Sequence, residues 1–181
     1  MRAEPRGRVY TIGHSTRSLE ELLGLLVERG VEVVVDVRRW PKSRRYPWFN
    51  REHLEEALRS AGIEYTWLGG PLGGRRRLGV DAPDTGGATC FESPGFRAYA
   101  IYLTTNPTAI QAMQELEALA SRRLVAILCA ERLPWRCHRK IIADWLALKG
   151  FEVIHIIDKH RETRHKPSKC ATIRDGRVTY T

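Results

Sequence analysis

The sequence predicts a single α/β domain with a doubly wound, mostly parallel sheet of about five strands, helices on both faces and a small C-terminal hairpin. Three observations support this fold. Short β-branched runs alternate with amphipathic helical patterns along the chain. The run at 31–37 is almost continuously β-branched, as in a strand buried on both faces. The length of 181 residues suits one compact domain covering 1–181.

The first half of the chain contains three strand patterns and two helix patterns. We expect strands at 9–12, 31–37 and 63–68, and helices at 19–29 and 51–61. Ser18 and Glu21 have the spacing of a capping box for the first helix, and Gly30 follows its last turn. Asn50 is the expected N-cap of the second helix. These elements form successive βα units.

The second half continues this alternation. Ser93-Pro94 and Asn106-Pro107 predict helix starts, because each places a capping side chain before a proline. We expect strands at 124–128 and 151–157, a helix beginning near Cys137, and a hairpin at 171–180. The Gly- and Arg-rich segment 69–90 lacks periodicity and is expected to be a functional loop or partly disordered, and 158–181 is a basic tail that includes the possible hairpin.

The formal net charge is +9, and arginine dominates the basic residues. This charge favours an anionic partner, either nucleic acid or a phosphorylated substrate, although a solvated basic surface has the same composition. Asn and Gln are rare while Arg and Glu are abundant, which suggests a thermophilic source.

The cellular setting is indicated by apolar runs and by cysteine usage. The amino terminus lacks an apolar signal region, and no run approaches the roughly 18 apolar residues of a membrane span. We therefore expect a cytoplasmic protein without a membrane partner. Four cysteines are too few for a disulfide scaffold, so we expect them to be free, catalytic or metal-bound, with a structural role for Cys90.

Polar and reactive side chains end three of the predicted strands: His14, Ser15, Asp36, Arg38, Cys129 and Glu131. Cys137, His138 and Arg139 then lie near the start of the next helix, where a thiol favours its thiolate. Ligands of α/β proteins bind at the carboxyl ends of strands, where the strand order reverses. If the first and fourth strands are neighbours at that point, the three turns build one pocket.

These residues stand in motifs that resemble those of a known family. The motifs are Thr11-Ile-Gly-His14-Ser15, Asp36-Val-Arg38 with Pro41-Lys-Ser43-Arg44 and Phe49-Asn50, Leu72-Gly73-Gly74, and Cys129-Ala-Glu131 with Cys137-His138-Arg139. As a set they are similar to the domain of unknown function 488 family over most of the chain. The resemblance implies that the matched positions form a common site, and it assigns no activity.

The segment 38–49 interleaves basic and aromatic side chains, as recognition of single strands or flipped bases requires. We therefore predict a protein that binds DNA or RNA and hydrolyses it, by base excision as in DNA repair or by strand cleavage. Asp36 and Glu131 would activate water, directly or through a metal such as Mg²⁺. The other catalytic candidates are Cys129, His14 and His138. The predicted nucleic-acid- or phosphate-binding residues are Ser15, Arg38, Arg39, Lys42, Arg44, Arg45, Trp48, Arg75, Arg76 and Arg139.

Other interpretations of the same residues stay open. A thiol-dependent enzyme acting on a small molecule would use Cys129 as nucleophile and His14 or His138 as its base, although the bulky loop at 133–135 is a poor anion cradle. Cys129, Cys137 and His138 could converge on a metal, but their spacing is not that of a zinc finger or ribbon, so zinc fits less well. A non-enzymatic adaptor would use the basic face only to dock nucleic acid.

The segment 38–49 and Asp36 each have a purely structural interpretation as well. Asp36 can serve as the ion-pair partner of Arg38 rather than as a catalytic group. The loop can be a solvated surface whose aromatic side chains, such as Trp48 and Phe49, pack into the core or brace the next helix.

Overall fold

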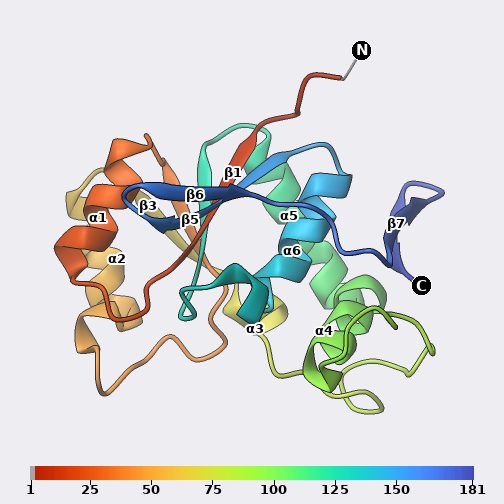
Figure 1. The fold of residues 1–181 in the computed structure, drawn as a ribbon. Helices are drawn as coiled ribbons and strands as arrows, with labels where there is room; N and C mark the ends of the chain where they lie inside the picture. The colour runs from red at the N-terminus through yellow and green to blue at the C-terminus, as the bar shows by residue number, and fades with distance from the viewer. Residues whose placement is uncertain (1–2) are drawn as a thin grey trace.

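The computed structural model describes residues 3–181 (Figure 1). Six strands form one sheet in the order β3-β2-β4-β1-β5-β6. Pairings among β1 to β5 are parallel, whereas β6 is antiparallel to β5. A separate hairpin is formed by β7 and β8. The strands are β1 (Arg8–Gly13), β2 (Val33–Asp36), β3 (Glu64–Trp67), β4 (Val125–Cys129), β5 (Glu152–Asp158), β6 (Arg161–Arg164), β7 (Ala171–Arg174) and β8 (Arg177–Tyr180).

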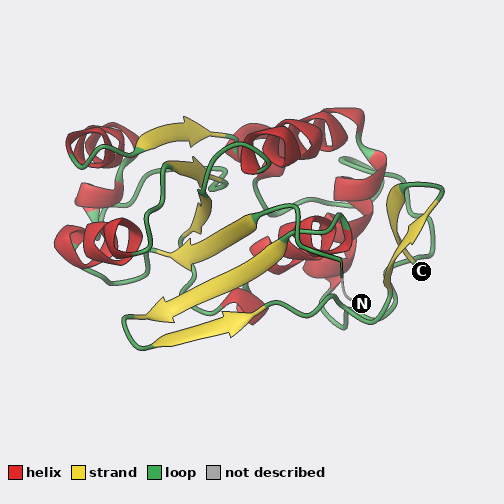
Figure 2. Cartoon of the chain, turned by 90° about the horizontal axis from the view of Figure 1, so that it is seen from above, coloured by secondary structure: helices red, strands yellow, loops and turns green. Residues whose placement is uncertain are grey.

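Helices cover both faces of the sheet, as two perpendicular views show (Figure 1, Figure 2). α1 and α2 share a core with Tyr10 and Val34, whereas α4, α5 and α6 share one with Val9 and Val35. Neighbouring residues of one strand thus enter different cores, because successive side chains point to opposite faces. The predicted doubly wound class is confirmed. The helices are α1 (Leu19–Glu28), α2 (Arg51–Ser60), α3 (Gly69–Leu72), α4 (Pro94–Thr105), α5 (Pro107–Ala120) and α6 (Arg139–Leu148), with 3-10 turns η1 (Pro47–Phe49) and η2 (Pro134–Arg136).

The strand order places the carboxyl ends of three strands side by side. β4 lies between β1 and β2, and β1 lies between β4 and β5. Gly13 at the end of β1 is opposite Cys129 at the end of β4, and Asp36 at the end of β2 is opposite Leu128. The expected neighbourhood of the first and fourth strands is therefore confirmed, and the turns after β1, β2 and β4 meet at one edge of the sheet.

Three of the four predicted helix caps use the expected side chain. The side-chain oxygens of Ser18, Ser93 and Asn106 accept backbone N–H groups in the first turns of α1, α4 and α5. Asn50 differs, because its Oδ1 accepts the backbone N–H of Ser43 at 2.6 Å and makes no hydrogen bond within α2. Asn50 therefore fixes the loop before α2 instead of capping the helix.

Two segments have more structure than their sequences indicate. The tail at 158–181 contributes β6, whose four residues are all exposed and so carry no apolar pattern. The segment 69–90 contains α3 and a turn in which Asp81 accepts the Arg77 N–H at 2.7 Å. Within residues 3–181, no helix has the length and apolar character needed to cross a bilayer.

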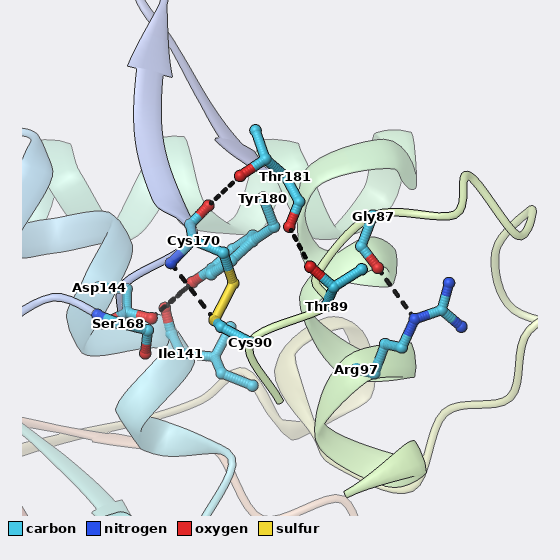
Figure 3. Close-up of a disulfide and its surroundings, with 10 residues drawn as sticks. All are labelled: Gly87, Thr89, Cys90, Arg97, Ile141, Asp144, Ser168, Cys170, Tyr180 and Thr181. Atoms are coloured by element: carbon cyan, nitrogen blue, oxygen red, sulfur yellow. Dashed lines mark hydrogen bonds between the residues drawn. A yellow bond between two sulfur atoms is a disulfide. The ribbon is translucent and has the colours of Figure 1, made fainter. Parts of the chain in front are cut away.

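Cys90 and Cys170 form a disulfide, which corrects the expectation that the cysteines would be free, catalytic or metal-bound. Figure 3 shows that the bond joins the end of segment 69–90 to the C-terminal hairpin. The two residues lie 80 positions apart, so no local spacing indicated the pair. Beside the bond, the Tyr180 hydroxyl donates to the Asp144 carboxylate on α6 at 2.9 Å (Figure 3). The hairpin is thus held to the domain by covalent and polar contacts.

A chain of polar side chains runs through the interior from α6. Arg139 donates its Nε–H to Thr11 Oγ1 at 3.1 Å, and Thr11 Oγ1 lies 2.6 Å from His155 Nδ1. His155 Nε2 lies 2.9 Å from His165 Nδ1, and His165 Nε2 lies 2.7 Å from Asp144 Oδ1. If Thr11 donates to His155, each later partner receives one hydrogen while both imidazoles stay neutral. Burial, together with the neighbouring His165 and Arg139, lowers the pKa of His155 to about 3.

Acidification is expected to destabilise the fold through His155. An unfolded histidine takes up a proton below its ordinary pKa of 6.5, whereas folded His155 stays neutral down to about 3. The unfolded state binds more protons in this window, so about 2 kcal/mol should be lost between neutral pH and about pH 5. Urea unfolding across this range measures the loss. His155→Gln should remove this part of the pH dependence, and the exposed control His53→Gln should keep it. An unchanged pH dependence in His155→Gln would contradict the assignment.

Candidate functional site

A cavity of about 500 Å³ lies where the turns after β1, β2 and β4 meet. Its volume is in the range of small-molecule sites. Segments 38–46 and 74–75 complete its wall. The structure therefore gathers residues from three strand ends, as expected for a doubly wound sheet. The predicted site residues that line the cavity are His14, Ser15, Arg38, Arg39, Lys42, Arg75, Cys129 and His138.

His14 is a buried imidazole in the wall of this cavity. Its ring stacks on Phe49, with 4.4 Å between the ring centroids. Nδ1 lies 3.1 Å from the carbonyl oxygen of Ser15, which can only accept, so Nδ1 carries the proton and Nε2 keeps its lone pair. Burial, together with the nearby charge of Arg38, lowers the pKa of His14 to about 4. The imidazole is therefore neutral near pH 7.

Tight backbone features bring the cavity loops together. A Cβ on Gly13 would lie 1.8 Å from the carbonyl oxygen of Glu131, so only glycine permits this approach of the β1 and β4 turns. Ser15 and Arg75 both line the cavity with positive φ, at 46° and 60°. Residues other than glycine rarely adopt a positive φ, and those that do cluster at functional sites.

Asp36 positions Arg38. The fully buried carboxylate accepts hydrogen bonds from Arg38 Nε at 2.9 Å and Nη2 at 2.7 Å, and from the Tyr65 hydroxyl at 2.6 Å. Burial opposes the charge of Arg38, but the hydrogen bonds and charge of Asp36 outweigh it and raise the pKa of the guanidinium. Asp36 is absent from the cavity lining, whereas Arg38 is part of it. The ion-pair interpretation of Asp36 is the one that the structure shows.

Glu131 and Arg139 also differ from their expected places. Glu131 is exposed, its Oε1 accepts the Leu133 N–H at 3.2 Å, and it does not line the cavity. Arg139 is fully buried and donates to the carbonyl oxygens of Glu131 and of Arg132, the latter at 2.9 Å. Instead of contacting a ligand phosphate, Arg139 braces the loop between β4 and α6.

The mouth of the cavity combines arginine with an exposed indole. Trp40 is 60% exposed, and the guanidinium carbons of Arg39 and Arg75 lie 4.9 and 5.7 Å from its ring centroid. Arg39 also donates to the Arg75 carbonyl at 2.9 Å, which ties the two loops. Gly74 lies close to His138 on the other side, because a Cβ there would be 3.1 Å from His138 Nδ1 and would crowd the imidazole.

Besides Arg139, four predicted binding residues lie outside the cavity lining: Arg44, Arg45, Trp48 and Arg76. Arg44 and Arg45 are exposed on the loop before α2. Trp48 donates its indole N–H to the Arg17 carbonyl at 3.2 Å, so it anchors that loop. Arg76 donates to the Gly73 carbonyl at 2.9 Å and lies over the Tyr102 ring, so it braces segment 69–90.

Cys129, Cys137 and His138 converge at the side of the cavity. Cys129 and Cys137 are free and buried. His138 Nδ1 lies 3.9 Å from Cys129 Sγ and 3.7 Å from Cys137 Sγ, and the three atoms are all within 4.8 Å of one another. The Arg139 N–H points to Cys137 Sγ at 3.5 Å. Cys129 and His138 line the cavity, whereas Cys137 is not part of its lining.

The pKa values of the two thiols are shifted in opposite directions from the ordinary value. The hydrogen bond to Cys137 and burial raise the pKa of Cys129 well above its ordinary value. The hydrogen bond from Cys129 lowers the pKa of Cys137 well below its ordinary value, and His138 and Arg139 assist. Of the two thiols, Cys137 is therefore the one that ionises more readily.

Sequence reasoning missed Tyr65 and did not show which aromatic rings of the segment 38–49 face the cavity. Tyr65 supplies the third hydrogen bond to Asp36, but a tyrosine on a β-strand carries no signal of such a partner. Trp40 and Tyr46 line the cavity in place of Trp48. Their position in the basic loop marked them as candidates, but only the fold shows which aromatic rings of that loop face the cavity.

The fold and the cavity define a doubly wound α/β protein with a basic, thiol-containing site at the carboxyl ends of its strands. Residues 18–146 match the family described as domain of unknown function DUF488, and the chain belongs to this family. Neither curated proteins nor solved structures gave a match. The matched range includes Asp36, Cys129 and Cys137, while His14 lies before it.

Proposed function

We propose that this protein binds nucleic acid and hydrolyses one nucleotide unit that enters the cavity. The observation that carries the proposal is the exposed Trp40 between Arg39 and Arg75 at the cavity mouth. Stacking surfaces beside phosphate-binding arginines are the common features of sites for single strands and flipped bases. The volume of about 500 Å³ is suited to one such unit rather than to a long segment.

Hydrolysis needs a group that transfers a proton. It also needs a positive charge near the bond that is broken. His14 offers the lone pair of Nε2, because its Nδ1 proton is held by the Ser15 carbonyl. Arg38 lines the cavity, and its Nε and Nη2 donate to Asp36. Its Nη1 has no acceptor within residues 3–181, so Nη1 is left to donate to a ligand. The expected roles of Asp36 and Glu131 in water activation lose support, because neither lines the cavity.

Trp40→Ala and Arg39→Ala are expected to weaken binding of a labelled single-stranded oligonucleotide. Loss of one stacking surface should cost about 1–3 kcal/mol, which is about 5- to 150-fold in affinity. Binding of the wild-type protein should weaken about tenfold or more between about 50 and 200 mM salt, because cations are released from the phosphates. Fluorescence anisotropy measures both effects.

A matched control is Arg122→Ala, because Arg122 is exposed just before β4, at the opposite end of the strand from the cavity. This variant should bind like the wild type. Release of bases or strand fragments is measured on the same oligonucleotides, and His14→Gln should abolish it while binding persists. Unchanged affinity in Trp40→Ala and Arg39→Ala would exclude the cavity as the binding site. Binding without any turnover would favour a non-enzymatic adaptor.

Cys129 supports a second candidate, a thiol-dependent enzyme acting on a small anionic molecule. Its Sγ lies 3.9 Å from His138 Nδ1 in the cavity wall. The raised pKa of Cys129 weighs against this candidate, because the thiol rather than the thiolate is present. Three results together would favour the thiol-dependent enzyme. Iodoacetamide would inactivate the protein unless the substrate is present, Cys129→Ser would lose the activity, and oligonucleotides would not be substrates.

The proposal also includes a cytoplasmic location in a thermophilic source. Disulfides are rare in the cytosol of mesophiles but common inside the cells of hyperthermophiles. The Cys90–Cys170 bond fits that setting.

A further inference from the structure

The side chains of Cys129, Cys137 and His138 form a triangle whose size matches one face of a zinc tetrahedron. Typical zinc–sulfur and zinc–nitrogen bonds of about 2.3 and 2.0 Å place neighbouring ligand atoms about 3.6 to 3.8 Å apart. The two sulfur–nitrogen separations here are 3.9 and 3.7 Å, and the sulfurs are within 4.8 Å of each other. A metal would enter with small shifts of the side chains.

The surroundings of the triangle are also those of a ligand set. The Arg139 N–H at 3.5 Å from Cys137 Sγ is a hydrogen bond of the kind that supports a metal-bound thiolate. His138 Nε2 is buried and has no hydrogen-bond partner within residues 3–181, so the imidazole is held only by its Nδ1 contacts to sulfur and by ring packing. Coordination through Nδ1 would replace these weak contacts to sulfur with a strong bond to a metal ion, and Nε2 would keep its hydrogen.

We propose that Cys129, Cys137 and His138 bind a thiophilic divalent metal ion, Zn²⁺ above all. Two thiolates and an imidazole select zinc over Mg²⁺, which prefers oxygen ligands. Two thiolates balance the charge of Zn²⁺, so the bound site is neutral beside the cationic Arg38 and Arg139. The ligand pattern differs from a zinc finger because Cys129 ends a strand and the other two residues precede a helix.

The metal would be catalytic rather than structural, because the protein supplies three ligands. Cys129 and His138 line the cavity, so the fourth position opens toward the substrate. A water molecule in that position would lose a proton more readily than bulk water, and His14 Nε2 or solvent would accept that proton. The resulting hydroxide would add to the phosphorus or to the glycosidic carbon, the bond to the leaving group would break, and the leaving oxygen or base would take up a proton from His14 or from solvent. This role rests on the proposed function, whereas the metal site itself does not.

The test is a Co²⁺ titration of the protein after removal of metals with a chelator, followed by competition with Zn²⁺. Co²⁺ in a tetrahedral site with thiolate ligands absorbs strongly in the visible and near-ultraviolet. We expect saturation at one Co²⁺ per chain and loss of the signal on adding Zn²⁺. Cys129→Ser, Cys137→Ser and His138→Gln should each weaken binding by about 100-fold or more. The double control Cys90→Ser with Cys170→Ser removes two cysteines outside the site and should keep the full signal.

Circular dichroism is used to check that each variant is folded, and the metal content of the protein purified from zinc-supplemented cells gives a second readout. Absence of a thiolate–Co²⁺ band, or a band that persists in Cys129→Ser, overturns the metal site. Oligonucleotide hydrolysis that survives complete metal removal overturns its catalytic role and leaves the proposed function standing. Tight, cysteine-dependent metal binding in a protein that neither binds nor cleaves oligonucleotides establishes the site and overturns the proposed function.

Discussion

Asp36→Ala is expected to destabilise the protein by about 3–5 kcal/mol, the cost of leaving a buried charge unpaired. Arg38 is only 6% exposed, and Asp36 accepts its Nε–H and Nη2–H. Removal of the carboxylate therefore leaves the Arg38 guanidinium buried in the wall of the cavity without its ion-pair partner. It also removes the acceptor of the Tyr65 hydroxyl. The loss is measured by urea unfolding at neutral pH.

Two further variants resolve the contributions to this effect. Asp36→Asn keeps an acceptor oxygen and should cost less than Asp36→Ala. Tyr65→Phe removes one hydrogen bond to a charged group and should cost about 1.5–3 kcal/mol. Glu56→Ala, at an exposed carboxylate on α2, should change stability by less than about 0.5 kcal/mol. An Asp36→Ala protein with wild-type stability and no activity would return Asp36 to the catalytic role first predicted from the sequence.

The strand ends could be predicted because they depend on local patterns. The β-branched run before Asp36 and the apolar run before Cys129 each mark a strand buried on both faces, and both appear as fully buried β2 and β4. Parallel strands of a doubly wound sheet bring their carboxyl ends together. Periodicity and general topology were therefore enough to place His14, Arg38 and Cys129 at one cavity.

The direction in which each side chain points could not be predicted from the same patterns. Glu131 lies two residues beyond β4, where the turn directs its carboxylate outward while its carbonyl accepts from Arg139. Arg139 has the positive charge expected of a phosphate-binding residue, but it is buried and donates its hydrogen bonds to backbone carbonyls of the loop. The need to satisfy buried polar groups, which only the folded chain reveals, decides these roles.

Strand β6 and the disulfide were missed for related reasons. β6 is an edge strand with exposed side chains, so it contributes hydrogen bonds to β5 without an apolar pattern. The Cys90–Cys170 bond depends on where the C-terminal hairpin packs, beside α4 and α6. Contacts between distant segments of this kind have no counterpart in residue spacing.

Loss of the Cys90–Cys170 disulfide is the second large effect that we expect. The bond closes a loop of 80 residues, for which the chain-entropy relation gives about 4.5 kcal/mol, and removal of a native disulfide typically costs about 2–5 kcal/mol. The Tyr180–Asp144 hydrogen bond remains in the double variant Cys90→Ser with Cys170→Ser, so its native fold should persist. The destabilisation should therefore come mainly from a freer unfolded chain.

Urea unfolding of this double variant and of the reduced wild type checks the prediction, and the two proteins should agree. Because neither cysteine lines the cavity, oligonucleotide affinity should be unchanged under conditions where the variant is folded. Cys129→Ser is the control for a general effect of losing a buried thiol. It keeps the disulfide, so the reductant should destabilise it as it does the wild type, whereas the double variant should not respond to the reductant. Equal stability of the oxidised and reduced wild type would show that the bond does not constrain the unfolded chain. In that case the hairpin would depend on its noncovalent contacts with α4 and α6 alone.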